Sequence, residues 1–131
     1  MITSKEWYIM NDLWENAPAT LMEITARMEQ TTGWSKSTCA TMLRRMTEKK
    51  IIGFEMRGKT KCFYPLVDRD EEVVPETRNF LKRIYDGSVG AMMSTLVRQG
   101  SLSREDIEEL SDILEKAKEQ TADRSSEKQR R

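Results

Sequence analysis

The sequence predicts a mainly α-helical protein with one small β-hairpin, arranged as a winged helix-turn-helix followed by a helical region. Two observations carry this prediction. The segment from Trp34 to Lys50 has one apolar stripe at helical spacing and an opposite face of small and cationic residues. Two short apolar runs follow at once on either side of a basic turn, Arg57 to Thr60, which is typical of a hairpin with glycine at the turn. A polar helix followed by a basic hairpin indicates a DNA-binding layout.

Capping boxes predict the first two helices, because a Ser or Thr followed three residues later by Glu satisfies two backbone N–H groups at a helix start. Thr3 and Glu6 open the first helix, which stops at 16–18. Thr20 and Glu23 open the second, which ends before Gly33. The inward faces are formed by Trp7, Met10, Leu13 and Trp14 in the first helix and by Leu21, Ile24 and Met28 in the second.

The third helix is expected to begin at Ser35 as its cap, with an apolar stripe of Cys39, Met42, Leu43 and Met46. Its small residues would let the backbone approach a groove, and its cations could meet phosphates. From 34 to 61 there are eight cations and two anions, although the formal net charge of the whole chain is zero. Such a cluster is typical of nucleic-acid binding. The candidate DNA-binding residues are Ser35, Lys36, Ser37, Thr38, Ala40, Thr41, Arg44, Arg45, Arg57, Lys59 and Lys61.

An acidic break at 68–72 predicts a domain boundary. We expect a winged-helix domain at 1–68, a helical dimerisation domain at 69–118 and a disordered polar tail at 119–131. Pro75 is expected at the first position of a helix that ends at 86–87, a second helix spans 89–98 before Gly100, and Ser103 caps a third. These helices are too short to close a core within one chain, so they should pack against a second copy. The candidate dimerisation residues are Phe80, Leu81, Ile84, Tyr85, Met92, Met93, Leu96, Ile107, Leu110, Ile113 and Leu114.

Several classes of function are disfavoured by what the sequence lacks. There is no histidine, which removes histidine-based triads and histidine zinc sites, and there is no glycine-rich phosphate loop. We therefore expect no enzyme, no metal and no cofactor. Cys39 and Cys62 are expected to be free thiols, and the nine methionines fall at core spacing. With no secretion signal and no membrane-length apolar run, a cytoplasmic location is expected.

Most of the chain, roughly residues 3–116, resembles the penicillinase repressor family. Each matching piece is weak alone, but their order and spacing together are fairly specific. The matching positions are Glu6, Trp7, Met10 and Trp14 in the first helix; Trp34, Ser35, Thr38, Thr41 and Arg45 in the third; 63–67 in the second hairpin strand; and Phe80, Leu81, Tyr85, Gly87, Ser88, 102–103 and 106–110 in the C-terminal half.

The resemblance implies a homodimer that binds a palindromic DNA operator and represses transcription, in an operon of the β-lactam-resistance type or a related stress- or metal-responsive operon. It implies that Thr38 and Thr41 face base edges or nearby phosphates, and that Ser35 and Arg45 hold the DNA backbone. A membrane sensor-protease would be the upstream partner. In β-lactam-responsive members induction cuts an Asn-Phe bond, and the aligned pair in this chain is Thr95-Leu96.

The chain departs from the family pattern at positions that set operator preference. It has Lys36 and Ser37 where Pro and Lys are frequent, and Ala40 where a long or basic residue is frequent. Its tail also lacks the cysteines of the copper-responsive members. The alternative function is a winged-helix module for protein contacts without DNA, since a fold does not fix a function. The cationic cluster on helix and hairpin together argues against that alternative.

Overall fold

The computed structural model of this protein describes the backbone of residues 1–129 and the side chains of residues 1–122. It divides into two compact units, Met1–Thr77 and Arg78–Arg131. The elements in chain order are α1 (Glu6–Asn16), β1 (Ala19–Thr20), α2 (Leu21–Thr31), α3 (Lys36–Glu48), β2 (Ile52–Arg57), β3 (Thr60–Pro65), α4 (Arg69–Tyr85), α5 (Val89–Arg98) and α6 (Arg104–Gln129). Within the part that the structure describes, no helix is both long and apolar enough to cross a membrane.

Both capping boxes predicted from the sequence are present. The Glu6 N–H donates to Thr3 Oγ1 over 3.3 Å, and Glu6 Oε1 accepts from the Thr3 N–H at 2.9 Å. The same reciprocal pair joins Thr20 and Glu23 at the start of α2. These bonds satisfy backbone donors that a helix start otherwise leaves unpaired; α2 begins at Leu21, as its box predicts, and α1 begins at Glu6, two residues later than a Thr3 cap predicts.

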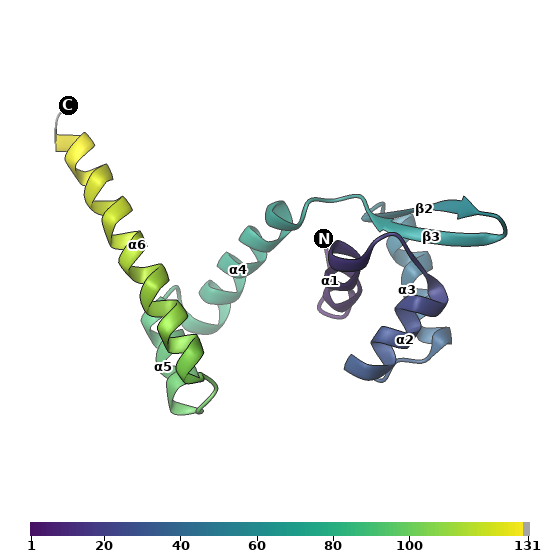
Figure 1. The fold of residues 1–131 in the computed structure, drawn as a ribbon, viewed down its shortest axis with the longest axis horizontal. Helices are drawn as coiled ribbons and strands as arrows, with labels where there is room; N and C mark the ends of the chain where they lie inside the picture. Colours follow the sequence, from purple (N-terminus) through teal and green to yellow (C-terminus); the bar gives the residue numbers. More distant parts are fainter. Residues whose placement is uncertain (130–131) are drawn as a thin grey trace. The chain divides into compact units, whose positions relative to one another are not determined.

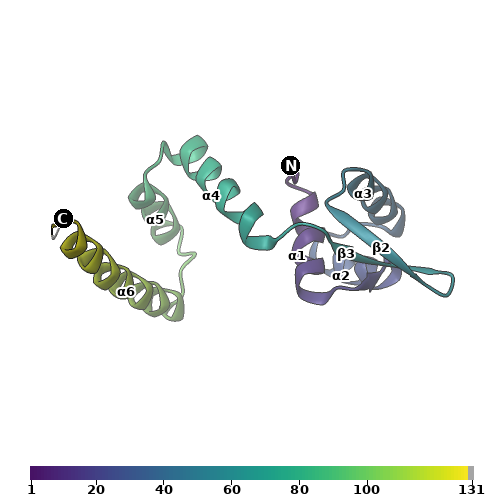
Figure 2. The same ribbon diagram turned by 90° about the horizontal axis from the view of Figure 1, so that it is seen from above.

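The core of the first unit lies between α1, α2, α3 and the sheet. Spacing of three and four residues puts the fully buried Ile9, Met10 and Leu13 on one face of α1. On α3, Cys39, Leu43 and Met46 are buried as predicted, while Met42 is half-buried. Most of the fully buried side chains therefore belong to α1, α2 and α3. Figure 2 shows these three helices grouped against the strands.

The sheet has three antiparallel strands in the order β1-β3-β2. The sequence predicted the β2–β3 hairpin but not β1, whose two residues pair with Phe63 and Cys62 of β3. A two-residue strand has too little sequence for a period-2 pattern, so no local signal marks it. The hairpin turns at Gly58, which has φ +63°, and extends beyond the helices as a wing (Figure 1).

Three side-chain interactions tie α1 to the other elements of the first unit. Asp12 accepts two hydrogen bonds from Arg27 of α2, at 2.5 and 3.1 Å. Glu6 accepts from Lys49 Nζ, just after α3, at 2.6 Å. The indole N–H of Trp14 donates to the carbonyl oxygen of Val67 over 3.0 Å, which holds the segment just after β3 against α1. Since Glu6 and Asp12 are both more than nine-tenths buried, these partners are what make their burial tolerable.

In the second part of the chain the first helix begins six residues earlier than expected. Pro75, which is predicted at the first helical position, lies inside α4, because this helix already begins at Arg69. Asp68 explains the early start: its carboxylate accepts from the Glu71 N–H at 3.2 Å. The acidic first turn that follows also complements the positive end of the helix dipole.

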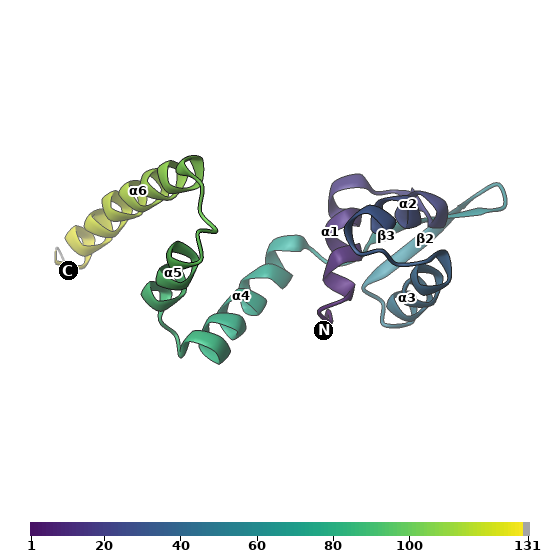
Figure 3. The same cartoon turned by 90° about the horizontal axis from the view of Figure 1, so that it is seen from below.

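The ends of α4 and α5 follow the predicted breakers. Asp86 and Gly87 adopt φ values of +52° and +85° after α4, and Gly100 adopts +68° after α5. Ser103 caps α6, accepting from the Asp106 N–H at 3.1 Å. Figure 3 shows α5 and α6 as separate rods joined by a loop, not as a closed bundle.

The last helix runs to Gln129, where the sequence analysis expected disorder from 119 onward. Beyond Ser103 the sequence has no Gly or Pro, and Glu, Lys, Ala and Arg are good helix formers, so nothing local ends the helix. Residues 130 and 131 of the expected tail lie outside the described residues.

We predict that the Glu6–Lys49 pair makes the first unit sensitive to acid. Burial by itself raises the pKa of Glu6, but the hydrogen bond from Lys49, the Thr3 N–H and the Lys49 charge together hold it below its ordinary value of 4.5. The stabilisation from ionised Glu6 is therefore complete above pH 4.5 and is lost as the pH falls through the lower folded-state pKa. Removing this charged hydrogen bond should cost about 1–3 kcal/mol at pH 7.

The measurement is urea unfolding of wild type and Glu6→Gln between pH 7 and pH 3, followed by tryptophan fluorescence. All three tryptophans lie in the first unit, so the signal reports that unit. The gap in unfolding free energy between the two proteins should close as the pH falls. Glu15→Gln, an exposed carboxylate of the same helix, should behave as wild type. A constant gap at every pH would contradict this role of the Glu6 charge.

Candidate nucleic-acid interface

The outward face of α3 forms a ridge of small and cationic residues. Ser35 fixes its start, because its hydroxyl accepts from the Thr38 N–H at 3.2 Å. All the candidate residues on this helix are exposed except Thr41, which is half-buried. Arg44 and Arg45 are neighbours in sequence, so their side chains leave the helix about 100° apart. The two guanidinium groups therefore address opposite flanks of the ridge.

A hollow of about 500 Å³ lies on one flank, which we name the N-terminal hollow. It separates the start of α1 from α3, and Lys5 and Arg45 both line it. Its full lining is Thr3, Lys5, Glu6, Ser37, Thr38, Thr41, Met42, Arg45 and Lys49. Three threonine hydroxyls, one serine hydroxyl and two unpaired cations around one concave surface suit a phosphate group.

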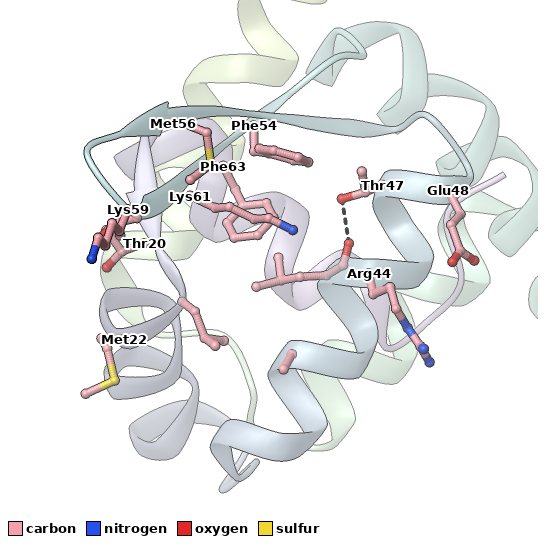
Figure 4. A pocket seen from close by; sticks show the side chains of 14 residues that line it. Thr20, Met22, Arg44, Thr47, Glu48, Phe54, Met56, Lys59, Lys61 and Phe63 are labelled. Atoms are coloured by element: carbon pink, nitrogen blue, oxygen red, sulfur yellow. Dashed lines mark hydrogen bonds between the residues drawn. The ribbon is translucent and has the colours of Figure 1, made fainter.

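A second hollow of about 560 Å³ lies on the other flank, between α3, the start of α2 and the wing; we name it the wing groove (Figure 4). Arg44 reaches it from α3, and Lys59 and Lys61 reach it from the hairpin. Its full lining is Thr20, Leu21, Met22, Ala40, Leu43, Arg44, Thr47, Glu48, Phe54, Met56, Lys59, Thr60, Lys61 and Phe63. The ridge of α3 thus has cations on both of its sides.

Two of the eight cations counted from the sequence are paired within the protein. Lys49 is held by Glu6, and Arg57 lies 2.9 Å from Glu55. Among the described residues, the remaining six form no ion pair within 4 Å: Lys36, Arg44, Arg45, Lys50, Lys59 and Lys61. The unpaired cations keep their charge available for an external anion.

The structure does not bring Arg57 together with the other candidate residues. Side chains alternate along a strand, and Arg57 shares a face with Glu55, whereas Lys61 lies opposite Met56 on the face that lines the wing groove. The structure adds Lys5 to the candidate residues, since it lines the N-terminal hollow. No local pattern could have identified it, because its position beside α3 depends on the tertiary contact between Glu6 and Lys49.

Cys39 lies beneath this surface and is fully buried on the inner face of α3. Burial raises the pKa of its thiol above the ordinary value. The reactive thiolate form is thereby disfavoured, which is the usual state of a structural cysteine. Cys62 is also free and buried.

The candidate dimerisation residues lie along α4, α5 and α6 and are at least partly exposed. Phe80, Ile84, Ile107, Ile113 and Leu114 are 42–60% exposed, and α4 and α5 contain no buried residue. Leu81, Tyr85, Met92, Met93, Leu96 and Leu110 are half-buried. Thr95 and Leu96, the pair at the expected cleavage position, lie inside α5, where the Thr95 hydroxyl donates to the Ala91 carbonyl oxygen over 3.1 Å.

Comparison with known proteins gives consistent matches. The family described as Penicillinase repressor matches residues 2–116. The methicillin resistance regulatory protein MecI of Staphylococcus aureus (strain N315) is 30% identical over 115 residues, covering 88% of this chain and 94% of that protein. The penicillinase repressor of Bacillus licheniformis is 28% identical over 117 residues, covering 89% and 91%. The DNA-binding domain of the repressor BlaI has the same fold over 54% of this chain and 87% of that domain, with a TM-score of 0.50 and 24% identity.

Proposed function

This chain belongs to the penicillinase repressor family, and we propose that it represses transcription by binding a palindromic DNA operator as a homodimer. The observation that carries the proposal is the arrangement of unpaired cations on both flanks of the exposed α3 ridge. An electrically neutral chain that concentrates six unpaired cations between residues 36 and 61, on and beside one helix and one wing, has a charge distribution typical of a DNA-binding protein.

The dimensions of α3 suit the major groove. A helix with its side chains is about 10–12 Å across, and the major groove of B-DNA is about 12 Å wide. With α3 in the groove, Ser37 and Thr41 at the centre of the ridge would face base edges. Arg45 with Lys5 would meet the phosphates of one strand, and Arg44 with Lys61 those of the other. The phosphate contacts would set the register and the central residues the sequence preference.

The homodimer is proposed from the apolar faces of the second unit. Seven large apolar side chains described there are 42–60% exposed, which is costly unless another surface covers them. A second copy offers the same stripes, so a two-fold interface is self-complementary. Two copies would also present two α3 ridges, which a palindromic operator requires.

Cleavage between Thr95 and Leu96 would divide α5, and with it the proposed dimer surface. A membrane sensor-protease acting there would release the operator by separating the two copies. This chain carries Thr95-Leu96 in place of the Asn-Phe pair, so we propose that a signal other than cleavage at this bond releases it.

Single cation removals should flatten the salt dependence of DNA binding. Arg45→Ala and Lys5→Ala each remove one proposed phosphate contact, so each should lower the magnitude of the slope of log K against log salt concentration by about 0.9. Affinity should fall for specific and non-specific DNA alike. The measurement is fluorescence anisotropy with DNA from the region upstream of the gene, at several salt concentrations.

Lys116→Ala, an exposed cation of α6, serves as the matched control and should leave the slope unchanged. Unchanged affinity and slope in both Arg45→Ala and Lys5→Ala would contradict the proposed docking of α3. Absence of any DNA binding by the wild type at low salt would instead favour the protein-contact module.

Substitution at the centre of the ridge should alter sequence preference. Thr41→Val keeps the shape of the side chain and removes its hydroxyl, so the penalty for individual base changes should shift by about 1–3 kcal/mol at one or two positions. Binding to a panel of operators with single base-pair changes measures this. An affinity loss that is equal for every operator in the panel would show that Thr41 contacts phosphates and not base edges.

A charge on the apolar stripe of α6 should separate the dimer. Leu110→Asp would place a carboxylate in the proposed interface, where it has no partner, and sedimentation equilibrium should show a shift from dimer toward monomer. Tryptophan fluorescence should remain that of wild type, because all three tryptophans lie in the first unit. Lys116→Asp, on the opposite face of α6, should stay dimeric. A wild type that is monomeric at micromolar concentration would contradict the proposed assembly.

A further inference from the structure

The wing groove has an apolar surface that DNA binding does not explain. Protein–DNA interfaces are more polar than other interfaces and strongly cationic. In the wing groove, however, Phe54, Met56 and Met22 are 37%, 54% and 65% exposed. Figure 4 shows side chains from the hairpin, α2 and α3 around one open space. The hydroxyl of Thr47 on the α3 wall already donates to the Leu43 carbonyl oxygen over 2.7 Å, so its proton is not available to a ligand.

The hairpin side of this groove combines an aromatic pair with a cation. Phe54 is the register partner of Phe63, and their ring centroids lie 5.9 Å apart at an interplanar angle of 60°. Lys61, two residues before Phe63, holds its Nζ 4.5 Å from the centroid of the Phe54 ring. This cation–π contact places an ammonium group at the edge of the apolar surface, not out in solvent.

The charge at the rim favours an anion. Arg44, Lys59 and Lys61 line the groove against a single carboxylate, Glu48. An uncharged apolar ligand would cover these cations without giving them a partner, which costs free energy. A ligand with an apolar body and one negative group satisfies both parts of the surface. The volume of about 560 Å³ lies within the range of small-molecule sites.

We propose that the wing groove binds a small amphipathic anion, an aromatic carboxylate, with its rings against the exposed Phe54 and Met56 and its carboxylate paired with Lys61. The regulatory part of this inference rests on the proposed function. Ala40, Arg44 and Lys61 belong both to the groove and to the proposed DNA-binding surface, so the ligand and DNA exclude each other. Such a ligand would release the operator directly, with no cleavage of the chain.

The first test measures the binding site without DNA. 2-Naphthoate is titrated into the ¹⁵N-labelled full-length protein and followed by amide chemical shifts, with uncharged 2-naphthamide as its neutral analogue. Shifts should concentrate at 20–22, 43–48 and 54–63, and naphthoate should bind at least five-fold more tightly than naphthamide. Lys61→Gln should abolish that preference. Arg57→Gln, a cation of the same hairpin outside the groove, should retain it.

Equal affinity for acid and amide, or shifts confined to the second unit, would overturn the proposed site. Shifts at the groove that remain unchanged in Lys61→Gln and in Phe54→Ala would overturn the assigned contacts. The Phe54→Ala variant is chosen because this ring is already partly exposed, so its loss should leave the core of the first unit intact.

The second test measures exclusion. With naphthoate at ten times its own dissociation constant, competition should raise the apparent Kd for DNA about 11-fold, and the rise should continue linearly with concentration. An unchanged DNA affinity with the groove occupied would overturn the exclusion. If the protein alone binds no DNA, the proposed function is wrong. The chemical-shift titration then still decides whether the groove binds the ligand, because it is carried out without DNA.

Discussion

The first unit depends on a single constraint, which is that α3 must bury one stripe and expose the opposite one. Cys39, Leu43 and Met46 enter the core formed with Ile9, Met10 and Leu13 of α1. Once these residues are buried, the direction of every other side chain on α3 follows from the helical period. The ridge, with Arg44 on one flank and Arg45 on the other, is therefore a geometric result of core packing.

The salt bridges around α1 serve the same constraint. Glu6 reaches Lys49 just after α3, and Asp12 reaches Arg27 on α2, so α2 and the C-terminal end of α3 are both fixed to α1. Fixing them has a cost in charge, because Lys49 is no longer available to an external anion. The unpaired cations of the cluster lie on α3, directly after it at Lys50, and on the wing. Within this basic cluster, Lys49 therefore stabilises the fold, whereas unpaired cations such as Arg44 and Arg45 are the ones proposed to contact DNA.

The sequence could predict those features that local chemistry decides. Two capping boxes, the Ser35 and Ser103 caps and the glycine turn at Gly58 mark the starts of four helices and the position of the hairpin, and all are present. The strand β1 depends on pairing with a distant strand, and the early start of α4 depends on Asp68, which the sequence analysis assigned to a domain break. A count of charges along the sequence cannot show that Lys5 lies beside α3, because this depends on tertiary packing. It also cannot show that Arg57 is neutralised by Glu55 on the same face of β2.

The exposed stripes of the second unit have a consequence for how repression would respond to protein supply. In the proposed dimer the DNA-binding species forms from two chains, so at low abundance its amount rises with the square of the chain concentration. A modest change in synthesis or turnover would then produce a larger change in operator occupancy. The exposed apolar faces of the C-terminal helices would thereby make repression depend steeply on the cellular concentration of the protein.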